Sequence, residues 1–270
     1  MEKSILSLLL VFVVTFIAQA QTEISATEIV EKINQKENIS YQNVVITGDL
    51  DLTRLDNMEL DNRNTGDDVR YISLVNSGIT FTNCIFKGKV LAYYNSQRNK
   101  TSYTTDFNEM VSFINCTFEE ASSFRHTRFY KQVNFNQSQF QKEVNFRHTS
   151  FKEASIFQAC QFEEEVDFRH TNFEDNLGFK DVVFMGEADF RHVDFPTYQD
   201  FSGTTFKGLA NCRHTVFKKG VDFSNAQFLK EGDFRHAYFA KPINLENVLF
   251  EGEVDFKHAN IDPAKDWRSN

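Results

Sequence analysis

Residues 166–187 read VDFRHTNFEDNLGFKDVVFMGE, and residues 188–192 begin the pattern again with ADFRH. Phenylalanine recurs here in alternating steps of five and six residues, at Phe168, Phe173, Phe179, Phe184 and Phe190. No helical period fits such steps. In an extended chain, residues two apart point to the same side, so each Phe and the mostly small residue two positions before it face one interior.

The same steps run from Phe113 to Phe256 and Ile261, and only Cys212 and Leu245 replace Phe on the way. A unit of five or six residues is too short to bury its own Phe. It must therefore stack on copies of itself, which is how a solenoid folds. Turning after every unit predicts a square coil of four units. The 30 Phe of the 270 residues fit one structural position that is filled repeatedly.

The length of one coil follows from a dipeptide on the outer surface. Arg-His recurs every 22 positions, which equals two pairs of five plus six. The members are Arg125-His126, Arg147-His148, Arg169-His170, Arg191-His192, Arg213-His214 and Arg235-His236, with Lys257-His258 last. We therefore expect an all-β rod of roughly nine coils with four inward positions in each.

The unit Ala188-Asp189-Phe190-Arg191-His192 resembles the pentapeptide-repeat family, whose repeat is Ala-Asp/Asn-Leu/Phe-X-X. Residues 166–170 and 254–258 are close variants, and the resemblance extends from Ile79 to Ile261. It implies a right-handed quadrilateral β-helix. The sixth residue in alternate units departs from the family pattern. The six-residue units hold most glycines of the repeat region and both of its prolines, Pro196 and Pro242. We therefore expect the corners that need turn-forming residues to lie in the six-residue units.

Residues 1–20 have the layout of a Sec-type signal peptide. Lys3 precedes an apolar run from Ile5 to Ala18, and small residues at Ala18 and Ala20 form a cleavage site. The apolar run is short for a membrane span, and no Cys follows to carry a lipid. We expect a mature protein that begins at Gln21, is secreted or periplasmic, and has no membrane span after cleavage.

Residues 21–69 are predicted to form an N-terminal cap. Ser25 and Glu28 have the spacing of a capping box before a short amphipathic helix, and residues 44–52 alternate as a strand does. The helix should close one end of the β-helix of residues 70–261, because an open coil edge exposes unpaired backbone. At the other end, either the tail of residues 262–270 covers the last coil or two copies meet as an end-to-end homodimer.

Phe81 and Phe113 begin nearly identical segments, but their separation is ten positions longer than the Arg-His period. Aligning their flanks places an insertion near residues 95–104, with Tyr93 and Tyr94 where Arg-His stands in the next coil. Two interpretations stay open, a tolerated surface insertion and a contact for a ligand or partner.

The same alignment places Cys84 and Cys116 in one inner column, one coil apart. Their spacing would permit a disulfide, but parallel side chains are poorly aimed for it, so buried thiols are the default. Cys160 and Cys212 are predicted core residues.

All seven His of the protein fall in one outer column, beside the column of six Arg and Lys257. Duplication of a coil would copy both columns whatever their use. Stacked Arg side chains repel one another. The residue before each inward position is Ser, Asn or Asp, on the same outer face as the Arg. These residues are Ser123, Asn145, Asp167, Asp189, Asn211, Asp233 and Asp255. An interleaved ladder of Asp and Arg is therefore the structural interpretation.

Three functional hypotheses compete with that interpretation. The Arg and His columns could form a binding stripe for an anionic polymer or for a protein with an acidic edge. Neighbouring imidazoles could bind Zn or Cu. Protonation of adjacent His could make the rod respond to pH. The candidate site residues are this stripe from Arg125 to His258, with Tyr93 and Tyr94 as a loop contact and no assigned metal site.

The net charge of −9 argues against general binding of nucleic acid. The sequence contains no serine-hydrolase elbow, His-Glu-x-x-His pair, phosphate loop or dinucleotide fingerprint, so an enzyme is the class that it favours least and no cofactor is expected. Some relatives in the resembled family are acidic rods that mimic DNA. The predicted signal peptide and the Arg column disfavour that role. The hypothesis that remains is an exported, non-catalytic rod for binding or scaffolding.

Overall fold

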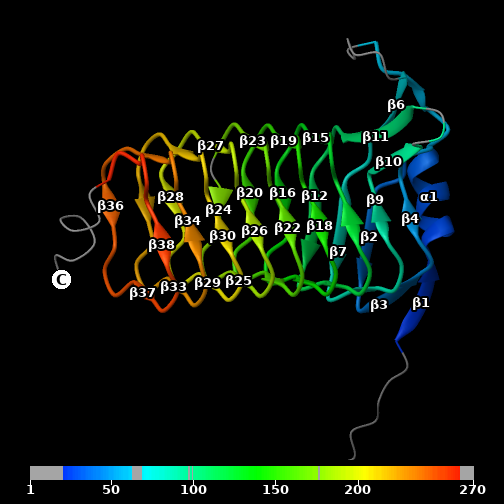
Figure 1. The fold of residues 1–270 in the computed structure, drawn as a ribbon. Coiled ribbons are helices and arrows are strands. Elements are labelled where there is room, and N and C mark those ends of the chain that lie inside the picture. The colour runs from blue at the N-terminus through cyan, green and yellow to red at the C-terminus, as the bar shows by residue number, and fades with distance from the viewer. Residues whose placement is uncertain (1–20, 63–68, 97, 99, 176, 262–270) are drawn as a thin grey trace, which may run out of the picture.

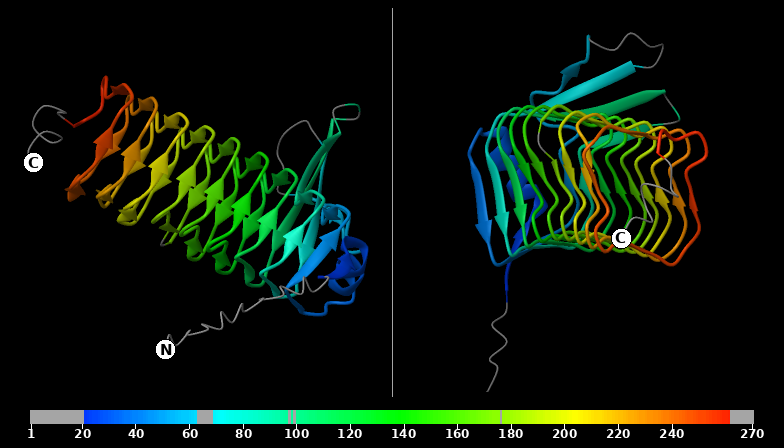
Figure 2. Two further views of the ribbon diagram at one scale, coloured as in Figure 1. Left: turned by 90° about the horizontal axis from the view of Figure 1, so that it is seen from below. Right: turned by 90° about the vertical axis from the view of Figure 1, so that its left-hand side faces the viewer.

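The computed structural model describes residues 21–62, 69–96, 98, 100–175 and 177–261. The predicted signal peptide and the predicted tail, with Trp267, lie outside these residues. The described chain forms a right-handed β-helix whose strands line up in four sheets, one on each side of a four-sided coil (Figures 1 and 2). This confirms the predicted fold class.

Sides 1 and 2 of the coil consist of parallel strands, taken in chain order. Side 1 contains β2 (Ile39–Gln42), β7 (Ile79–Thr82), β12 (Val111–Ile114), β16 (Val133–Asn134), β20 (Ser155–Ile156), β24 (Leu177–Gly178), β28 (Gln199–Asp200), β32 (Val221–Asp222) and β36 (Ile243–Asn244). Side 2 contains β1 (Thr22–Ser25), β3 (Val44–Thr47), β8 (Ile85–Phe86), β13 (Thr117–Phe118), β17 (Gln139–Phe140), β21 (Gln161–Phe162), β25 (Val183–Phe184), β29 (Thr205–Phe206), β33 (Gln227–Phe228) and β37 (Leu249–Phe250).

Sides 3 and 4 complete each coil. Side 3 contains β4 (Leu50–Asp51), β9 (Val90–Leu91), β14 (Ser122–Ser123), β18 (Val144–Asn145), β22 (Val166–Asp167), β26 (Ala188–Asp189), β30 (Ala210–Asn211), β34 (Gly232–Asp233) and β38 (Val254–Asp255). Side 4 contains β5 (Glu59–Leu60), β6 (Val69–Val75), β10 (Tyr93–Ser96), β11 (Thr101–Phe107), β15 (Arg128–Phe129), β19 (Ser150–Phe151), β23 (Asn172–Phe173), β27 (Asp194–Phe195), β31 (Val216–Phe217) and β35 (Tyr238–Phe239).

The register between coils is constant throughout the regular part of the rod and equals the Arg-His period. Val144 pairs with Val166, and Val166 pairs with Ala188. The register is longer at the N-terminal end, where Val111 pairs with Ile79 and Ile79 pairs with Ile39. Two excursions explain these longer steps. One is the antiparallel hairpin of β10 and β11, at the predicted insertion, and the other contains β5 and β6.

Four columns of Phe fill the interior. Rings one coil apart stack face to face, as Phe146 and Phe168 do with centroids 5.0 Å apart. Rings of different columns meet edge to face, as Phe157 and Phe168 do at 5.6 Å. Both arrangements are favourable for aromatic quadrupoles. Because every ring has neighbours above, below and beside it, the Phe side chains of the regular coils are almost completely buried.

The small residue two positions before many Phe also bonds to the preceding coil. The hydroxyl of Thr171 donates to the carbonyl oxygen of Phe146 at 2.7 Å, and that of Thr149 donates to Phe124 at 2.6 Å. Cys160 takes the same position with its thiol, 2.9 Å from the carbonyl oxygen of Phe135. These residues are small because they fit under the chain and satisfy a carbonyl that the ladder leaves with a free lone pair.

Helix α1 (Ala26–Asn34) begins at Ser25, whose hydroxyl accepts a hydrogen bond from the backbone N–H of Glu28 at 3.1 Å. This confirms the predicted N-cap. Ala26, Ile29 and Ile33 are buried, and the helix lies across the N-terminal end of the rod (Figure 1). It therefore shields the interior of the first coil from solvent. No helix in the described part of the chain is long and apolar enough to cross a membrane.

From Phe113 onward, every residue in the left-handed region except Gly220 falls in a five-residue step, two positions after the inward residue. They are the seven His on one side and Asn115, Gln137, Ala159, Asp181, Gly203, Asn225 and Asn247 on the diagonally opposite side. We expected the glycines of the six-residue units to form tight turns, and this expectation is wrong. Only Gly220 among these glycines has a positive φ, of 101°. The reason is that the five-residue step makes the tighter turn, which needs positive φ.

Glycines of the six-residue units serve close packing instead. A Cβ placed on Gly208 would lie 2.1 Å from the carbonyl oxygen of Gly186, and one on Gly186 would lie 2.5 Å from the backbone of Glu164. Successive coils thus approach one another closely at this corner. A side chain there would push two coils apart.

We therefore predict that Gly208→Ala lowers the free energy of unfolding by about 1–3 kcal/mol, because the new methyl group overpacks the corner. Gly178→Ala is the matched control. A Cβ at Gly178 has open space around it, so this change should be neutral or slightly stabilising. Chemical denaturation of both variants measures the difference, and equal stabilities would contradict the explanation.

Candidate functional site

The structure brings all the predicted stripe residues to one turn of the coil, between sides 3 and 4. We call this row the Arg–His face. It comprises Arg125, His126, Arg147, His148, Arg169, His170, Arg191, His192, Arg213, His214, Arg235, His236, Lys257 and His258. Each His has φ between 55° and 64°. Since His is among the residues that tolerate this conformation, the backbone is one reason for the column.

The seven imidazole rings form one continuous stack along the rod. Neighbouring centroids are 4.7 to 4.9 Å apart, and interplanar angles run from 3° to 26°. Ring nitrogens bind ligands in the plane of the ring, so parallel rings do not direct several nitrogens at one point. Among the described residues, there is no group of three or more His, Cys, Asp or Glu that could hold a metal ion. This geometry does not favour the metal hypothesis.

Burial and neighbouring cations lower the pKa of five of the stacked His, which disfavours their charged form. Loss of hydration lowers the pKa of His126 to about 3, and the nearby cations Arg70 and Arg125 contribute to this shift. Desolvation likewise lowers the pKa of His148 to about 4, with His170 and Arg147 as the next contributors. The pKa values of His192, His214 and His236 are lowered mainly by desolvation. A stack of neutral rings avoids like-charge repulsion.

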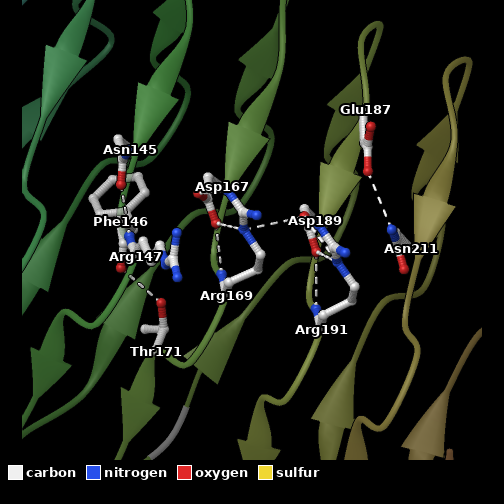
Figure 3. A network of polar contacts seen from close by, with 10 residues as sticks. All are labelled: Asn145, Phe146, Arg147, Asp167, Arg169, Thr171, Glu187, Asp189, Arg191 and Asn211. Atoms are coloured by element: carbon white, nitrogen blue, oxygen red, sulfur yellow. Dashed lines mark hydrogen bonds and ion pairs between the residues drawn. The ribbon is translucent and has the colours of Figure 1, made fainter. Parts of the chain in front are cut away.

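Asp and Arg alternate along the middle of the face, as the structural interpretation predicted (Figure 3). Asp189 is 1% exposed and accepts from Arg191 at 2.9 Å (Nε) and 2.6 Å (Nη2). Arg169 Nε also lies 3.3 Å from the Asp189 carboxylate, one coil away. Each of these Arg side chains therefore contacts a carboxylate of its own coil, and Arg169 reaches the next one as well. This relieves the repulsion between stacked guanidinium groups.

The same carboxylates shape the turn itself. Asp167 Oδ1 accepts from the backbone N–H of Arg169 at 2.9 Å, and Asp189 Oδ1 accepts from that of Arg191 at 3.1 Å. Asn145 makes the equivalent bond to Arg147 at 2.9 Å without any charge. Asp or Asn thus forms an Asx turn in each of these coils, and only Asp adds an ion pair.

The ion pairs are incomplete. Within the described part of the chain, the Arg side chains that follow Ser123, Asn145 and Asn211 have no carboxylate within ion-pair distance. These are Arg125, Arg147 and Arg213. Figure 3 shows Arg147 beside Phe146 with no bond to a carboxylate. Asp side chains therefore neutralise the face at Arg169, Arg191 and Arg235, whereas Arg125, Arg147 and Arg213 keep their positive charge.

The hairpin of β10 and β11 stands at the N-terminal end of this face. Tyr93 contacts His126 with centroids 5.5 Å apart, and the guanidinium of Arg125 lies 5.2 Å from the Tyr93 centroid. The predicted loop contact therefore joins the stripe through Tyr93. Tyr94 points to the other face of the hairpin.

On that other face, Tyr94 meets Tyr103, and Arg54 lies over both rings at 5.5 and 4.7 Å. Sequence reasoning missed Arg54, Tyr103 and Arg70. The only signal was the excess of aromatic and basic residues near the insertion. Which of them share a face depends on the pairing of Tyr94 with Tyr103, and no repeat period encodes that pairing.

A family model described as pentapeptide repeats (9 copies) matches residues 135–183 and 213–260. The chain contains pentapeptide repeats. Its four-sided coil and its inward Phe columns agree with this family. No curated protein and no solved structure matches the chain.

All four cysteines of this protein are buried free thiols. Cys84 and Cys116 lie one coil apart, as the alignment predicted, and their thiols also contact backbone carbonyls, for example that of Thr82, 3.3 Å from Cys84 Sγ. A hydrogen bond from Cys116 lowers the pKa of Cys84 to about 7. The pKa of Cys116 is raised by this same contact and by burial. The default expectation of thiols rather than a disulfide is confirmed.

We predict that the ion pairs, rather than the Asx turns alone, stabilise the middle of the face. Asp189→Asn keeps the turn but removes the contact with Arg191 and Arg169, and should cost about 1–3 kcal/mol. Asp200→Asn is the control, because Asp200 makes the same turn bond, to Ser202 at 2.9 Å, with no Arg two positions later. Chemical denaturation should show a loss for the first variant only. A similar loss of stability in both variants would mean that the Asp charge stabilises the turn and that the ion pair with Arg adds nothing.

We also predict a dependence of stability on pH. Because the folded state lowers the pKa of His126, the unfolded chain binds more protons below about pH 6.5. The free energy of unfolding should therefore fall as the pH drops from about 6.5 towards about 4.5, by on the order of 1–2 kcal/mol for His126 after allowance for partial exposure. His126→Asn keeps the left-handed turn and should reduce the slope. Identical slopes in the two proteins would contradict the assignment.

Proposed function

We propose that this protein is an exported, non-catalytic scaffold rod that binds an anionic partner through its Arg–His face. The partner would be an anionic polymer or a protein with an acidic edge. The observation that carries the proposal is the fixed row itself, in which an Arg-His pair, or its Lys257 variant, stands in every coil from Arg125 to His258 in an unbroken register. A rod with this geometry suits a ligand that is itself extended and repetitive.

The physical basis is the low cost of binding to a rigid surface. Hydrogen-bonded strands repeat at about 4.8 Å, so the turns on this face are spaced at the same interval. The Phe columns prevent the coils from sliding, and the His stack packs the turns against one another. Little conformational entropy is lost when a preorganised row of donors meets its ligand. Several weak contacts can then add up along one polymer.

The Arg–His face differs in charge from the rest of the protein, and it favours an anionic partner over a cationic one. The protein as a whole is acidic, with 38 Asp and Glu against 29 Lys and Arg. Within the described Arg–His face, Arg125, Arg147 and Arg213 carry positive charge that no side-chain carboxylate neutralises. An acidic polymer would therefore be repelled by most of the surface and attracted to this row.

The proposal of export rests on the sequence of residues 1–20 alone. A basic residue, an apolar run and small residues at the cleavage site would direct the chain out of the cytoplasm. Such a location supports a partner from the cell envelope, where acidic polymers are exposed. A rod without a catalytic role would hold such a polymer or position it relative to other proteins.

The test is binding of defined polyanions to protein recovered from the periplasm of expressing cells. The mass should show that the chain begins at Gln21. Calorimetry with polygalacturonate and polyglutamate should detect binding that weakens as the salt concentration rises. Arg147→Gln with Arg213→Gln should weaken it about tenfold. Lys180→Gln, at the equivalent position of the diagonally opposite turn, should leave it unchanged. No binding, or an equal loss in the control, would contradict the proposal.

A further inference from the structure

Two consecutive coils at the N-terminal end of the Arg–His face lack the carboxylate that the central coils have. Ser123 stands in β14 and Asn145 in β18, where Asp167 and Asp189 stand in β22 and β26. Ser123 pairs with Asn145 in the ladder, so the two missing carboxylates are direct neighbours. Arg125 and Arg147 follow them and are neighbours as well.

The two Arg side chains are held without an acceptor for their inner nitrogen. Nε of Arg125 and Nε of Arg147 are both buried and have no hydrogen-bond partner. In the paired coils this atom bonds to Asp, as Nε of Arg169 does with Asp167 at 2.9 Å. A buried donor on a charged group is costly when it is left unsatisfied. The two coils therefore present two neighbouring guanidinium groups, and the Nε–H of each lacks a hydrogen-bond acceptor.

The hairpin adds a third cation and an aromatic wall. Tyr93 pairs with Thr104, and Thr104 pairs with Ile72, so Arg70, two residues before Ile72, lies on the same face of this small sheet as Tyr93. That face is directed at His126, because Tyr93 contacts the His126 ring. Nε of Arg70 is also buried without a partner, although its Nη1 lies 4.0 Å from Asp61. The cation–π contact with Tyr93 holds Arg125 in place without neutralising it.

The charges near this place are mostly positive. Arg70, Arg125 and Arg147 all lower the pKa of His126, and so does its neighbour His148. In the coil of Arg125, the outer residues of side 3 are Ala121 and Ser123, which carry no charge. In the next coil, Glu143 is exposed and lies four residues before Arg147. Three Arg side chains thus lie near His126, at the end of the row that the hairpin flanks.

We propose that Arg125 and Arg147 together bind one tetrahedral oxyanion, a phosphate or sulfate group, beside Tyr93. A guanidinium fork binds two oxygens, and Asp189 bonds to Arg191 through both of its oxygens, with Arg169 as a more distant contact at 3.3 Å. A phosphate or sulfate group has enough oxygens for two forks, and a phosphate dianion matches two cations. Neutral His126 adds no further charge. This inference narrows the proposed function, on which it rests, to one ligand chemistry and one end of the face.

The test introduces, by substitution, the carboxylates that Asp167 and Asp189 provide in the paired coils. In Ser123→Asp with Asn145→Asp, each new Asp should pair with the following Arg, so this double variant should fold and be at least as stable. Phosphate or sulfate at millimolar concentration, compared with chloride at equal ionic strength, should raise the melting temperature of the natural protein and bind in calorimetry. Binding by the double variant should be at least about tenfold weaker. Lys180→Gln, on the diagonally opposite turn and outside the Arg–His face, should bind as the natural protein does.

The outcomes separate this proposal from the broader one. A sulfated polysaccharide such as dextran sulfate should bind if the group is carried on a polymer, whereas binding of inorganic phosphate alone would identify a free ion as the ligand. If polygalacturonate binds along the face but neither phosphate nor sulfate does, the proposed function stands and this inference is wrong. Equal binding by the natural protein and the double variant would also overturn it.

Discussion

The parallel pairing of each residue with its counterpart in the next coil is the constraint on which the rest of the structure depends. It places every side chain directly beside its own copy, about 4.8 Å away. For an interior Phe this is favourable, because identical rings stack and exclude water. For an outer Arg or His it is unfavourable, because identical charges then face one another. The chemistry of the surface is therefore decided by how each column of like residues avoids repelling itself.

The two columns of the Arg–His face solve this problem differently. Buried Asp side chains separate the guanidinium groups of the central coils, and Asp189 contacts two Arg at once. In the His column, partial burial and the cations beside the rings lower the pKa of His126 and His148 and so disfavour their charged forms. The face is thus mostly a stabilised part of the fold. Within the described part of the chain, Arg side chains without a carboxylate partner stand where Ser123, Asn145 and Asn211 replace Asp, and these exceptions carry the functional argument.

The His column also has a structural origin that lies in the backbone. The second residue after the inward position has positive φ in both five-residue steps, and Asn, Asp, Gln, Ala or Gly occupies it on the opposite turn. His tolerates this conformation and stacks well, so duplication of a coil would preserve it without any selection for metal or proton binding. A role in binding is better sought in the positions where the copies differ than in those where they agree.

Sequence by itself determined the four-sided coil, its length, the Phe columns, the Ser25 cap, the place of the insertion and the common row of Arg and His. These are properties of a local pattern repeated many times, and a repeat must superimpose on itself. Only the tertiary structure decided that the tight turns fall in the five-residue steps, that Tyr93 and Tyr94 face opposite ways, and that Arg70 joins the row. The last two features depend on pairing between β6, β10 and β11, which occurs once and leaves no period in the sequence.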